Sequence, residues 1–452
     1  QEDNAGMRGA PPAQTTIPLV PPMNILLILD DALRPRNMGC YGYAKPTSPN
    51  CDRLAVEGVR FENCIATSAH TFPPVVSLLT GQTPFSHGMM APKDYTRWLH
   101  HGAWDDRRLP LHVLADAGYL VDGELVSRWA PLGFTRDRND FGAYLDAHAG
   151  ERWFYLAEPY PTHLPYDPPQ AYYEQFVDPD FRPDDATRRR LDIVRSRMIL
   201  HPPDVQAAME VTTDDAIGEG DEAHKRSSAI VEFEPQDAPG VQALYDGEVR
   251  VFDDLVGGWL AKLEALGILD DTLVIVTSDH GEELLERGHV GHTSCNLKGT
   301  LYDESIYVPL IMRYPKRLPA GTVVRQQISQ IDLMPTLFDL LGLEFPFVPD
   351  GESLLPLIDG QTDVFRAEAY AETPPAGWQA LPGDERRMWC VRTAEWKLIV
   401  THDPTTGTER SELYHLTDDP GERQNVITRE TDVAGRLRDL LDRQREGSES
   451  CG

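Results

Sequence analysis

The chain has 452 residues, of which 41% are hydrophobic and 25% charged, a composition typical of a globular protein. Its net charge of −30 at pH 7 argues against a nucleic-acid-binding surface and against attachment to an anionic membrane. There is no apolar run of about 18 residues or more, so we expect no membrane-spanning helix. The length predicts two or three domains, or one large α/β domain with an appendage.

Residues 1–22 form a polar, Pro-rich tail. The first predicted element is the apolar run 24–29 that follows it. A run that is apolar on both faces is typical of a buried central strand in a parallel sheet. Asp30 and Asp31 come next, at the carboxyl end of the strand, where open α/β sheets bind ligands. These adjacent carboxylates would repel each other unless a cation neutralises them; the alternative is a turn with solvated aspartates.

The stretch 68–81 contains the candidate nucleophile. Thr71 stands two residues before Pro73-Pro74, and an apolar run ending in Gly81 follows, which predicts a helix. Thr71 would then lie at a helix N-terminus, where backbone N–H groups and the helix dipole attract an anion. A hydroxyl there is well placed to attack a phosphate or sulfate ester. The alternative is that Thr71 serves only as the helix N-cap.

The middle of the chain alternates predicted strands and helices. The expected helices cover residues 48–58, 109–118, 241–266 and 332–341, and the expected strands cover residues 59–61, 119–121, 153–157 and 308–312. His163 follows a strand on a Pro-rich loop, which would face a cleft or lie on the surface. Residues 176–240 are rich in Asp, Glu, Pro and Arg and are expected to form an acidic insertion over or beside the site.

A second apolar run, 272–277, predicts another buried strand that leads directly to Asp279 and His280. Carboxylate and imidazole groups are ligands that divalent cations accept. Both strands end in possible cation ligands, and Thr71 lies between them in the chain, at the predicted helix terminus. This pattern predicts one shared cation site. His289 and His292 follow in a Gly-hinged segment.

The last part of the chain, beyond about residue 365, changes to a β pattern. Strands are expected at 388–392, 396–400 and 411–416, the last two joined as a hairpin, before a closing helix at 433–445. The six cysteines have no metal-binding spacing, and so few in a long chain favour a reducing compartment. We therefore expect a cytoplasmic protein, unless a signal peptide has been removed.

Taken together, these motifs resemble the sulfatase family of the alkaline phosphatase superfamily, in the right order and over nearly the whole chain. The matching pieces are residues 24–31, Gly39-Cys40-Tyr41-Gly42, Thr71-x-Pro73 with 77–81, 163–166, 277–282, 298–305 and 414–422. The resemblance implies an α/β fold: a central, mostly parallel sheet sandwiched by helices over residues 23–365. A smaller C-terminal α+β subdomain, residues 366–452, would contain an antiparallel sheet.

The resemblance also implies one divalent metal ion, which could be Ca, Mg, Mn or Zn, and a small anionic ester as substrate. The metal ligands would be oxygen and nitrogen donors from five residues: Asp30, Asp31, Thr71, Asp279 and His280. Other side chains would bind the anionic group or protonate the leaving group: His163, His292 and Lys298, with His289 as a lesser candidate. Whether the protein is a homo-oligomer is left open.

Two departures from the family pattern bear on the chemistry. Formylglycine-dependent sulfatases have Cys or Ser in a C/S-x-P-x-R pattern, whereas this chain has Thr71 and Val75. Formylglycine is therefore not expected, and an unmodified Thr suits a phosphothreonine intermediate better than a sulfate ester. The pair Asp279-His280, in place of Asp-Asn, also resembles the phosphonate monoesterase and phosphodiesterase branch.

A phosphodiester or phosphonate monoester is thus the favoured substrate. The alternatives are a sulfate ester, transfer to an acceptor other than water, and an inactive homologue that only binds metal. A two-metal phosphomonoesterase would need a second Asp-His-His set, and the sequence offers no clear one beyond His289 and His292.

Overall fold

The computed structural model describes residues 23–89, 107–200, 229–292, 299–375 and 386–449. Its centre is an eight-stranded sheet with the strand order β12-β2-β11-β8-β1-β5-β3-β4. The strands of this sheet are β1 (Asn24–Asp30), β2 (Val59–Ile65), β3 (Leu120–Gly123), β4 (Arg136–Asp137), β5 (Trp153–Ala157), β8 (Thr272–Ser278), β11 (Tyr307–Arg313) and β12 (Thr322–Ser329). Only β11 runs antiparallel to its neighbours, so the sheet is mostly parallel, as predicted.

The two central strands, β1 and β8, are parallel and in register over their whole length, from Asn24 beside Thr272 to Asp30 beside Ser278. Every residue of both strands is buried, which explains why both sequences are apolar runs without alternation. Because the strands end at the same level, Asp31 and Asp279 leave the sheet side by side.

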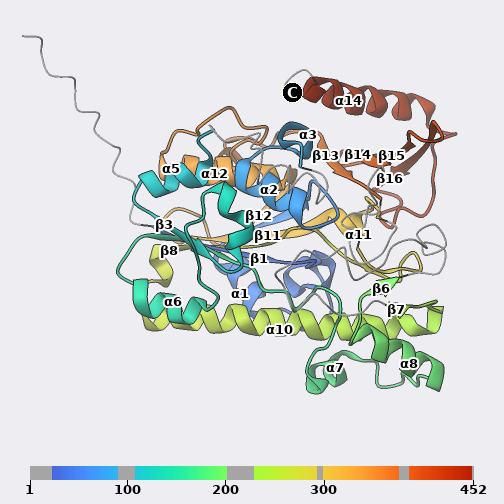
Figure 1. The fold of residues 1–452 in the computed structure, drawn as a ribbon, viewed down its shortest axis with the longest axis horizontal. Coiled ribbons are helices and arrows are strands. Elements are labelled where there is room, and N and C mark those ends of the chain that lie inside the picture. The colour runs from blue at the N-terminus through green and yellow to red at the C-terminus, as the bar shows by residue number, and fades with distance from the viewer. Residues whose placement is uncertain (1–22, 90–106, 201–228, 293–298, 376–385, 450–452) are drawn as a thin grey trace, which may run out of the picture.

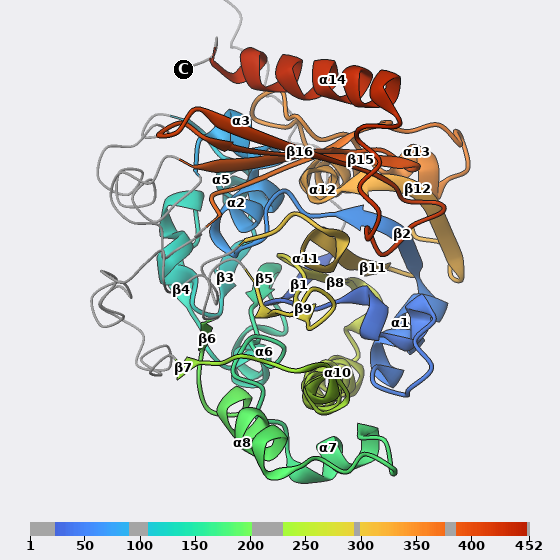
Figure 2. The same cartoon turned by 90° about the vertical axis from the view of Figure 1, so that its right-hand side faces the viewer.

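Helices cover both faces of this sheet (Figures 1 and 2), with α10 on one face and α2 and α12 on the other. Alternate residues of β1 enter the two layers: Leu27 belongs to the core that contains α2, and Leu26 to the core that contains α10. The helices are α1 (Pro49–Glu57), α2 (Phe72–Thr80), α3 (Pro84–His87), α5 (Pro110–Asp116), α6 (Phe141–His148), α7 (Gln170–Phe176), α8 (Asp185–Val194), α10 (Ala238–Ala265), α11 (Asp303–Ile306), α12 (Leu333–Leu341), α13 (Leu355–Ile358) and α14 (Thr431–Glu449).

Shorter elements connect these layers. The 3-10 helices are η1 (Pro35–Asn37), η2 (Gly39–Tyr41), η3 (Val126–Leu132), η5 (Pro235–Asp237), η6 (Leu269–Asp271) and η7 (Gln330–Asp332). Two small two-stranded sheets pair β6 (Ile199–Leu200) with β7 (Ala229–Ile230), and β9 (Glu283–Leu284) with β10 (Val290–Gly291). The β9–β10 hairpin follows directly after Asp279 and His280.

The C-terminal part forms a separate four-stranded antiparallel sheet, with α14 packed on it (Figure 2). Its strands, in spatial order, are β13 (Ala369–Thr373), β14 (Arg387–Arg392), β15 (Trp396–Asp403) and β16 (Thr408–His415). The sheet and α14 share a small core of their own, which includes Leu398, Leu413 and Leu441. The predicted C-terminal antiparallel sheet is therefore present, and β15 and β16 form the expected hairpin.

A buried group of charges joins the C-terminal sheet to the rest of the protein. Arg392 on β14 makes two hydrogen bonds to the Asp303 carboxylate, at 3.0 and 2.8 Å. The Lys397 ammonium on β15 lies 2.9 Å from Asp303 and 2.9 Å from Glu422. Burial alone would raise the pKa of Asp303, but Arg392 and Lys397 outweigh it and hold that pKa well below its usual range.

The predicted helices and strands of the α/β part are present, and the structure adds elements that were not predicted, among them α6, α7 and β4. The strand expected at 59–61 extends to Ile65, because its polar residues lie where β11 and β12 pair with it on both sides. Strand β12 was not predicted, since its sequence of Val, Arg and Gln lacks a clear apolar pattern. The insertion at 176–240 contributes α8, β6 and β7 within its described residues.

The division of the chain at residue 365 stays a prediction. In the part of the chain that the structure describes, no helix combines the length and the apolar character needed to cross a membrane.

The start of α2 is fixed by a buried hydrogen-bond chain to α3. Thr67 donates a hydrogen bond to Ser77 (2.9 Å), and Ser77 Oγ lies 2.9 Å from His87 Nε2. The other ring nitrogen, Nδ1, accepts a hydrogen bond from the Met89 N–H at 3.1 Å. An imidazole that accepts at Nδ1 is neutral, and burial accordingly lowers the pKa of His87 to about 3.

We predict that replacing Lys397 by methionine lowers the free energy of unfolding by about 3–5 kcal/mol, because Asp303 and Glu422 would lose a shared buried counter-charge. The matched control is Lys316→Met, a half-exposed lysine paired with Asp271, which should cost less than about 1 kcal/mol. Denaturant unfolding of both variants measures the difference. Equal losses in the two variants would contradict the importance of the buried group.

We predict that His87 contributes to acid unfolding. Its folded-state pKa lies below that of the unfolded chain, so the unfolded state gains protons first and stability falls as pH drops below about 6.5. Between pH 6.5 and 4, the wild type should lose on the order of 3 kcal/mol relative to His87→Gln, which cannot titrate. Denaturant unfolding as a function of pH tests this. Parallel pH profiles for the two proteins would show that the ring protonates freely in the fold.

Candidate functional site

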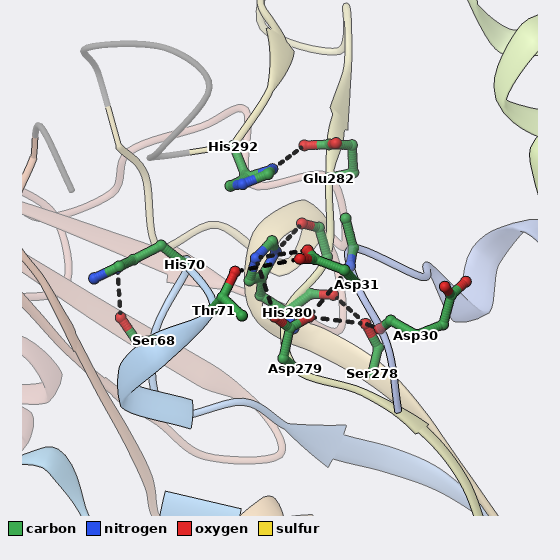
Figure 3. A network of polar contacts seen from close by, with 12 residues as sticks. Asp30, Asp31, Ser68, His70, Thr71, Ser278, Asp279, His280, Glu282 and His292 are labelled. Carbon is green, nitrogen blue, oxygen red and sulfur yellow. Dashed lines mark hydrogen bonds and ion pairs between the residues drawn. The ribbon is translucent and has the colours of Figure 1, made fainter. Parts of the chain in front are cut away.

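Thr71 lies immediately before α2, and its side chain faces the end of β1 rather than the helix. Its backbone is helical (φ −51°, ψ −48°), and its side chain makes no capping hydrogen bond. Instead, the hydroxyl Oγ1 donates to Asp31 Oδ2 at 3.3 Å (Figure 3). Thr71 is therefore not simply an N-cap, which was the alternative left open by the sequence.

The N-terminus of α2 offers fewer backbone donors than the sequence argument assumed. Pro73 and Pro74 have no N–H, and the Val75 N–H donates to the Thr71 carbonyl at 3.3 Å. Val75 is itself buried and apolar. Positive charge for an anionic substrate must therefore come largely from side chains or a bound cation.

Asp31, Asp279 and His280 converge at the carboxyl ends of β1 and β8. His280 Nε2 lies 3.4 Å from Asp31 Oδ1 and 3.5 Å from Asp279 Oδ2. Two backbone N–H groups, those of Ala32 (3.2 Å) and His280 (2.7 Å), donate to Asp279 Oδ1 and so fix its carboxylate. Ala32 reaches that position in a left-handed conformation with φ +70°, which is unusual for alanine and holds its N–H toward Asp279.

This group fits a divalent cation. Asp31 Oδ1, Asp279 Oδ2 and His280 Nε2 are all buried, and none has a hydrogen-bond partner among the described residues. The His280 Nδ1–H donates to the Gly281 carbonyl (2.8 Å), so the lone pair at Nε2 faces the two carboxylates. Burial, and then the charge of Asp279, raise the pKa of Asp31. A cation bound here would satisfy all three atoms and remove that cost.

Asp30 lies apart from this group. Its carboxylate points away from Asp31, Asp279 and His280 (Figure 3), and it accepts a hydrogen bond from Thr162 at 3.0 Å. Burial, followed by the charges of Asp31 and Asp279, raises the pKa of Asp30 well above its usual range. The role of Asp30 as a metal ligand stays a prediction.

His163 and His292 lie next to Asp31, with one ligand atom of each of the three residues within 4.8 Å of the others. Their ring centroids are 4.9 Å apart, and the ring of His292 is 4.2 Å from that of His280. The His163 Nδ1 donates to the Leu164 carbonyl at 2.5 Å, and the His292 Nδ1 lies 3.0 Å from the Glu282 carboxylate. Burial lowers the pKa of both histidines, and for His292 the charges of His280 and His163 add to the effect.

Of the two remaining predicted residues, His289 belongs to neither candidate metal group and Lys298 is not described by the structure. His289 is at the tip of the β9–β10 hairpin, where its Nδ1 is 4.0 Å from Glu283. Lys298 lies outside the described residues, so its predicted contact with the anionic group stays a prediction.

Arg128, on η3, is a site residue that sequence reasoning missed. Its positive charge acts on both Asp31 and His163, lowering the pKa of each. Glu158 at the end of β5 holds it, with Arg128 Nη2 donating to Glu158 Oε1 at 3.3 Å, and the side chain is about a quarter exposed. No signal in the sequence marked it, because it lies in an irregular segment with no recognisable motif.

Comparisons with known proteins find relatives over most of the chain. A family model described as "Sulfatase" matches residues 23–343, and one described as "N-sulphoglucosamine sulphohydrolase, C-terminal" matches residues 292–447. The chain is 27% identical to arylsulfatase A of Bos taurus, over 91% of this chain and 85% of that protein. It is 25% identical to an N-acetylglucosamine-6-O-sulfatase of Bacteroides thetaiotaomicron, over 89% and 82% of the two chains.

Solved structures share the fold. A phosphonate monoester hydrolase of Agrobacterium radiobacter superposes with a TM-score of 0.67 at 21% identity, covering 94% of this chain and 96% of that one. A protein solved with its substrate D-glucosamine-2-N,6-O-disulfate superposes with a TM-score of 0.67 at 20% identity, covering 95% and 98%. At these identities the likeness establishes the fold alone.

We predict that divalent cations stabilise the protein after chelation, because they neutralise the buried carboxylates Asp31 and Asp279. At about a hundred times the dissociation constant, the gain should be about 2.7 kcal/mol. The double variant Asp31→Asn/Asp279→Asn should lose this gain and melt higher than the chelated wild type, since its repulsion is gone. Thermal melting with and without Mn²⁺ measures both effects.

The control for this experiment is Asp122→Asn, which alters a buried carboxylate on β3 that belongs to neither candidate metal group. This variant should keep the cation-dependent gain. An equal gain in the Asp31→Asn/Asp279→Asn protein would place the cation elsewhere.

Proposed function

The chain belongs to the sulfatase family and is an ester hydrolase, and we propose that it cleaves a phosphodiester or phosphonate monoester through a covalent ester on Thr71. One divalent cation at Asp31, Asp279 and His280 is part of this proposal. The observation that supports it most directly is the 3.3 Å contact of the Thr71 hydroxyl with Asp31, at the edge of the candidate cation group.

In the proposed reaction Thr71 is the nucleophile. Its Oγ1 forms a bond to phosphorus while the bond to the leaving oxygen breaks in line, and water then hydrolyses the threonine ester. Asp31 orients the hydroxyl through the hydrogen bond that it accepts. When bound, the cation would lower the pKa of the hydroxyl and polarise a non-bridging oxygen of the substrate.

Phosphorus is favoured over sulfur by the nucleophile itself. An unmodified threonine would give a sulfate ester that water breaks down with difficulty, whereas a phosphothreonine ester is more tractable. The buried, apolar Val75 one turn into α2 and the Asp279-His280 pair support the same choice. In this proposal formylglycine is not required.

A sulfate ester is the second candidate, and a specific observation favours it. The curated relatives at 25–27% identity are named for sulfatase activities, and they align over about nine-tenths of this chain. The two candidates therefore need a direct comparison on one enzyme preparation.

We predict that Thr71→Val, which keeps the shape of the side chain but removes the hydroxyl, lowers kcat by at least about 10³-fold. Thr71→Ser should retain most of the turnover, because the nucleophilic oxygen is kept. The matched control is Thr80→Val at the other end of α2, where the hydroxyl donates to the Val76 carbonyl and accepts from the Gln82 N–H, away from Asp31. Turnover by Thr71→Val at the wild-type rate would rule out this nucleophile.

The substrate class is tested with chromogenic aryl esters of a phosphodiester, a phosphonate and sulfate, assayed at the same Mn²⁺ concentration. We expect the highest kcat/KM for one of the two phosphorus esters. Peptide mass spectrometry after rapid acid quenching should then find the phosphorus-containing ester on Thr71. Faster turnover of the sulfate ester would select the second candidate instead.

A further inference from the structure

The edge strand β13 of the C-terminal sheet lies against the loop that carries Thr71. The Glu372 N–H donates to the Thr67 carbonyl at 2.9 Å, and Thr373 Oγ1 lies 3.2 Å from His70 Nδ1. Thr67, His70 and Thr373 are all buried. Residues about 300 positions apart in the chain therefore share hydrogen bonds just before the proposed nucleophile.

The His70 ring belongs to this contact and points away from the candidate cation group (Figure 3). Its Nδ1 lies 3.2 Å from Ser68 Oγ as well as from Thr373 Oγ1. The Thr373 hydroxyl donates to the Pro374 carbonyl at 3.3 Å, which leaves its oxygen to accept from the His70 N–H. Because His70 directly precedes Thr71, a ring held in this way sets the direction of the backbone at Thr71.

The first turn of α2 has few backbone hydrogen bonds that could hold Thr71. Pro73 and Pro74 have no N–H, and the Val75 N–H donates to the Thr71 carbonyl at 3.3 Å. The Thr71 side chain makes no capping hydrogen bond, and its contact with Asp31 is also 3.3 Å long. The position of the hydroxyl therefore depends on contacts outside the helix.

The C-terminal sheet also holds α2 through α3. Phe85 of α3 packs against the core that this sheet shares with α14. His87, the last residue of α3, lies 2.9 Å from the Ser77 hydroxyl of α2, which accepts from Thr67 at 2.9 Å. The sheet thus reaches the Thr71 loop both directly and through the neighbouring helix.

We propose that β13 positions the nucleophile, and that Thr373, acting through His70, is a positioning residue for Thr71. This role rests on the proposed function, because it assigns the contacts to the orientation of Thr71 as the attacking residue. Thr373 does not touch the reacting atoms; its hydroxyl keeps the Thr71 oxygen aligned with the bond that breaks. Misplacing a reacting atom by about 1 Å can lower a rate by about 10²-fold.

The test compares Thr373→Val, which keeps the shape of the side chain, with Thr373→Ser, which keeps the hydroxyl. The probe is the chromogenic aryl ester that the wild type cleaves fastest, with Mn²⁺ present. We expect Thr373→Val to lower kcat by about 10²-fold at an unchanged KM, and Thr373→Ser to recover most of that loss. A raised KM at an unchanged kcat would overturn the proposal, because it would assign the contact to substrate binding.

The matched control is Thr272→Val at the amino end of β8, the end opposite the candidate site. Thr272 is also buried, and its hydroxyl donates to the Ile268 carbonyl at 2.8 Å. This variant should keep the wild-type kcat even where its melting temperature falls as far as that of Thr373→Val. An equal loss of kcat in both variants would show that general destabilisation is the cause, and would overturn the positioning role.

Two further readouts separate positioning from other causes. The thermal stabilisation by Mn²⁺ should be the same in Thr373→Val as in the wild type; its loss would overturn the proposal, because the contact would then act through the cation. Peptide mass spectrometry after rapid acid quenching should find slower formation of the ester on Thr71. An ester that forms at the wild-type rate in Thr373→Val would overturn the positioning role alone. A wild type that forms no ester on Thr71 would overturn the proposed nucleophile as well.

A second pair of variants applies where Thr373→Val fails to fold. The side-chain amide of His70→Asn can still donate to the Thr373 hydroxyl, whereas His70→Leu cannot. We expect kcat to be at least about 10-fold higher in His70→Asn than in His70→Leu, at similar KM. Equal kcat values in the two proteins would overturn the role of this hydrogen bond.

Discussion

The arrangement of the candidate site depends on the repulsion between two buried carboxylates. Asp31 and Asp279 follow neighbouring parallel strands that end at the same level, so the backbone brings them together whether or not their charges are balanced. Burial strengthens the repulsion, because no water is present to weaken it. The stability of the folded backbone therefore offsets the repulsion between these two carboxylates until a positive charge balances them.

Each surrounding segment positions one part of the site around Asp31 and Asp279. The rigid strands β1 and β8 carry the carboxylates, and α2 carries Thr71 to within hydrogen-bond distance of Asp31. The loops after β5 and after the β9–β10 hairpin place the rings of His163 and His292 4.9 Å apart. Backbone groups hold the candidate ligands in place: the Ala32 N–H fixes Asp279, and the Gly281 carbonyl fixes the ring of His280. The centre is thus preorganised by atoms that take no part in the chemistry.

The sequence was sufficient to predict those parts that depend on local pattern. Continuous apolar runs identified β1 and β8, and the residues directly after them were predicted to converge as candidate ligands because parallel strands share an edge. It could not show that Asp30 turns toward Thr162 while Asp31 turns inward, because adjacent strand residues point to opposite sides and the choice depends on packing. Nor could it pair His163 with His292, or place Arg128 beside them. Those contacts arise between loops, whose course is set by the whole fold.

The buried charges between α11 and the C-terminal sheet impose an order on biosynthesis. Asp303 leaves the ribosome well before Arg392 and Lys397, which neutralise it, and before Glu422, which accepts from its N–H. The loop that leads to Thr71 also waits for this sheet, since the Glu372 N–H donates to the Thr67 carbonyl and Thr373 contacts His70. The Thr71 loop and α11 can therefore complete their contacts only after the strands of the C-terminal sheet have been synthesised, so this part of the site forms late in folding.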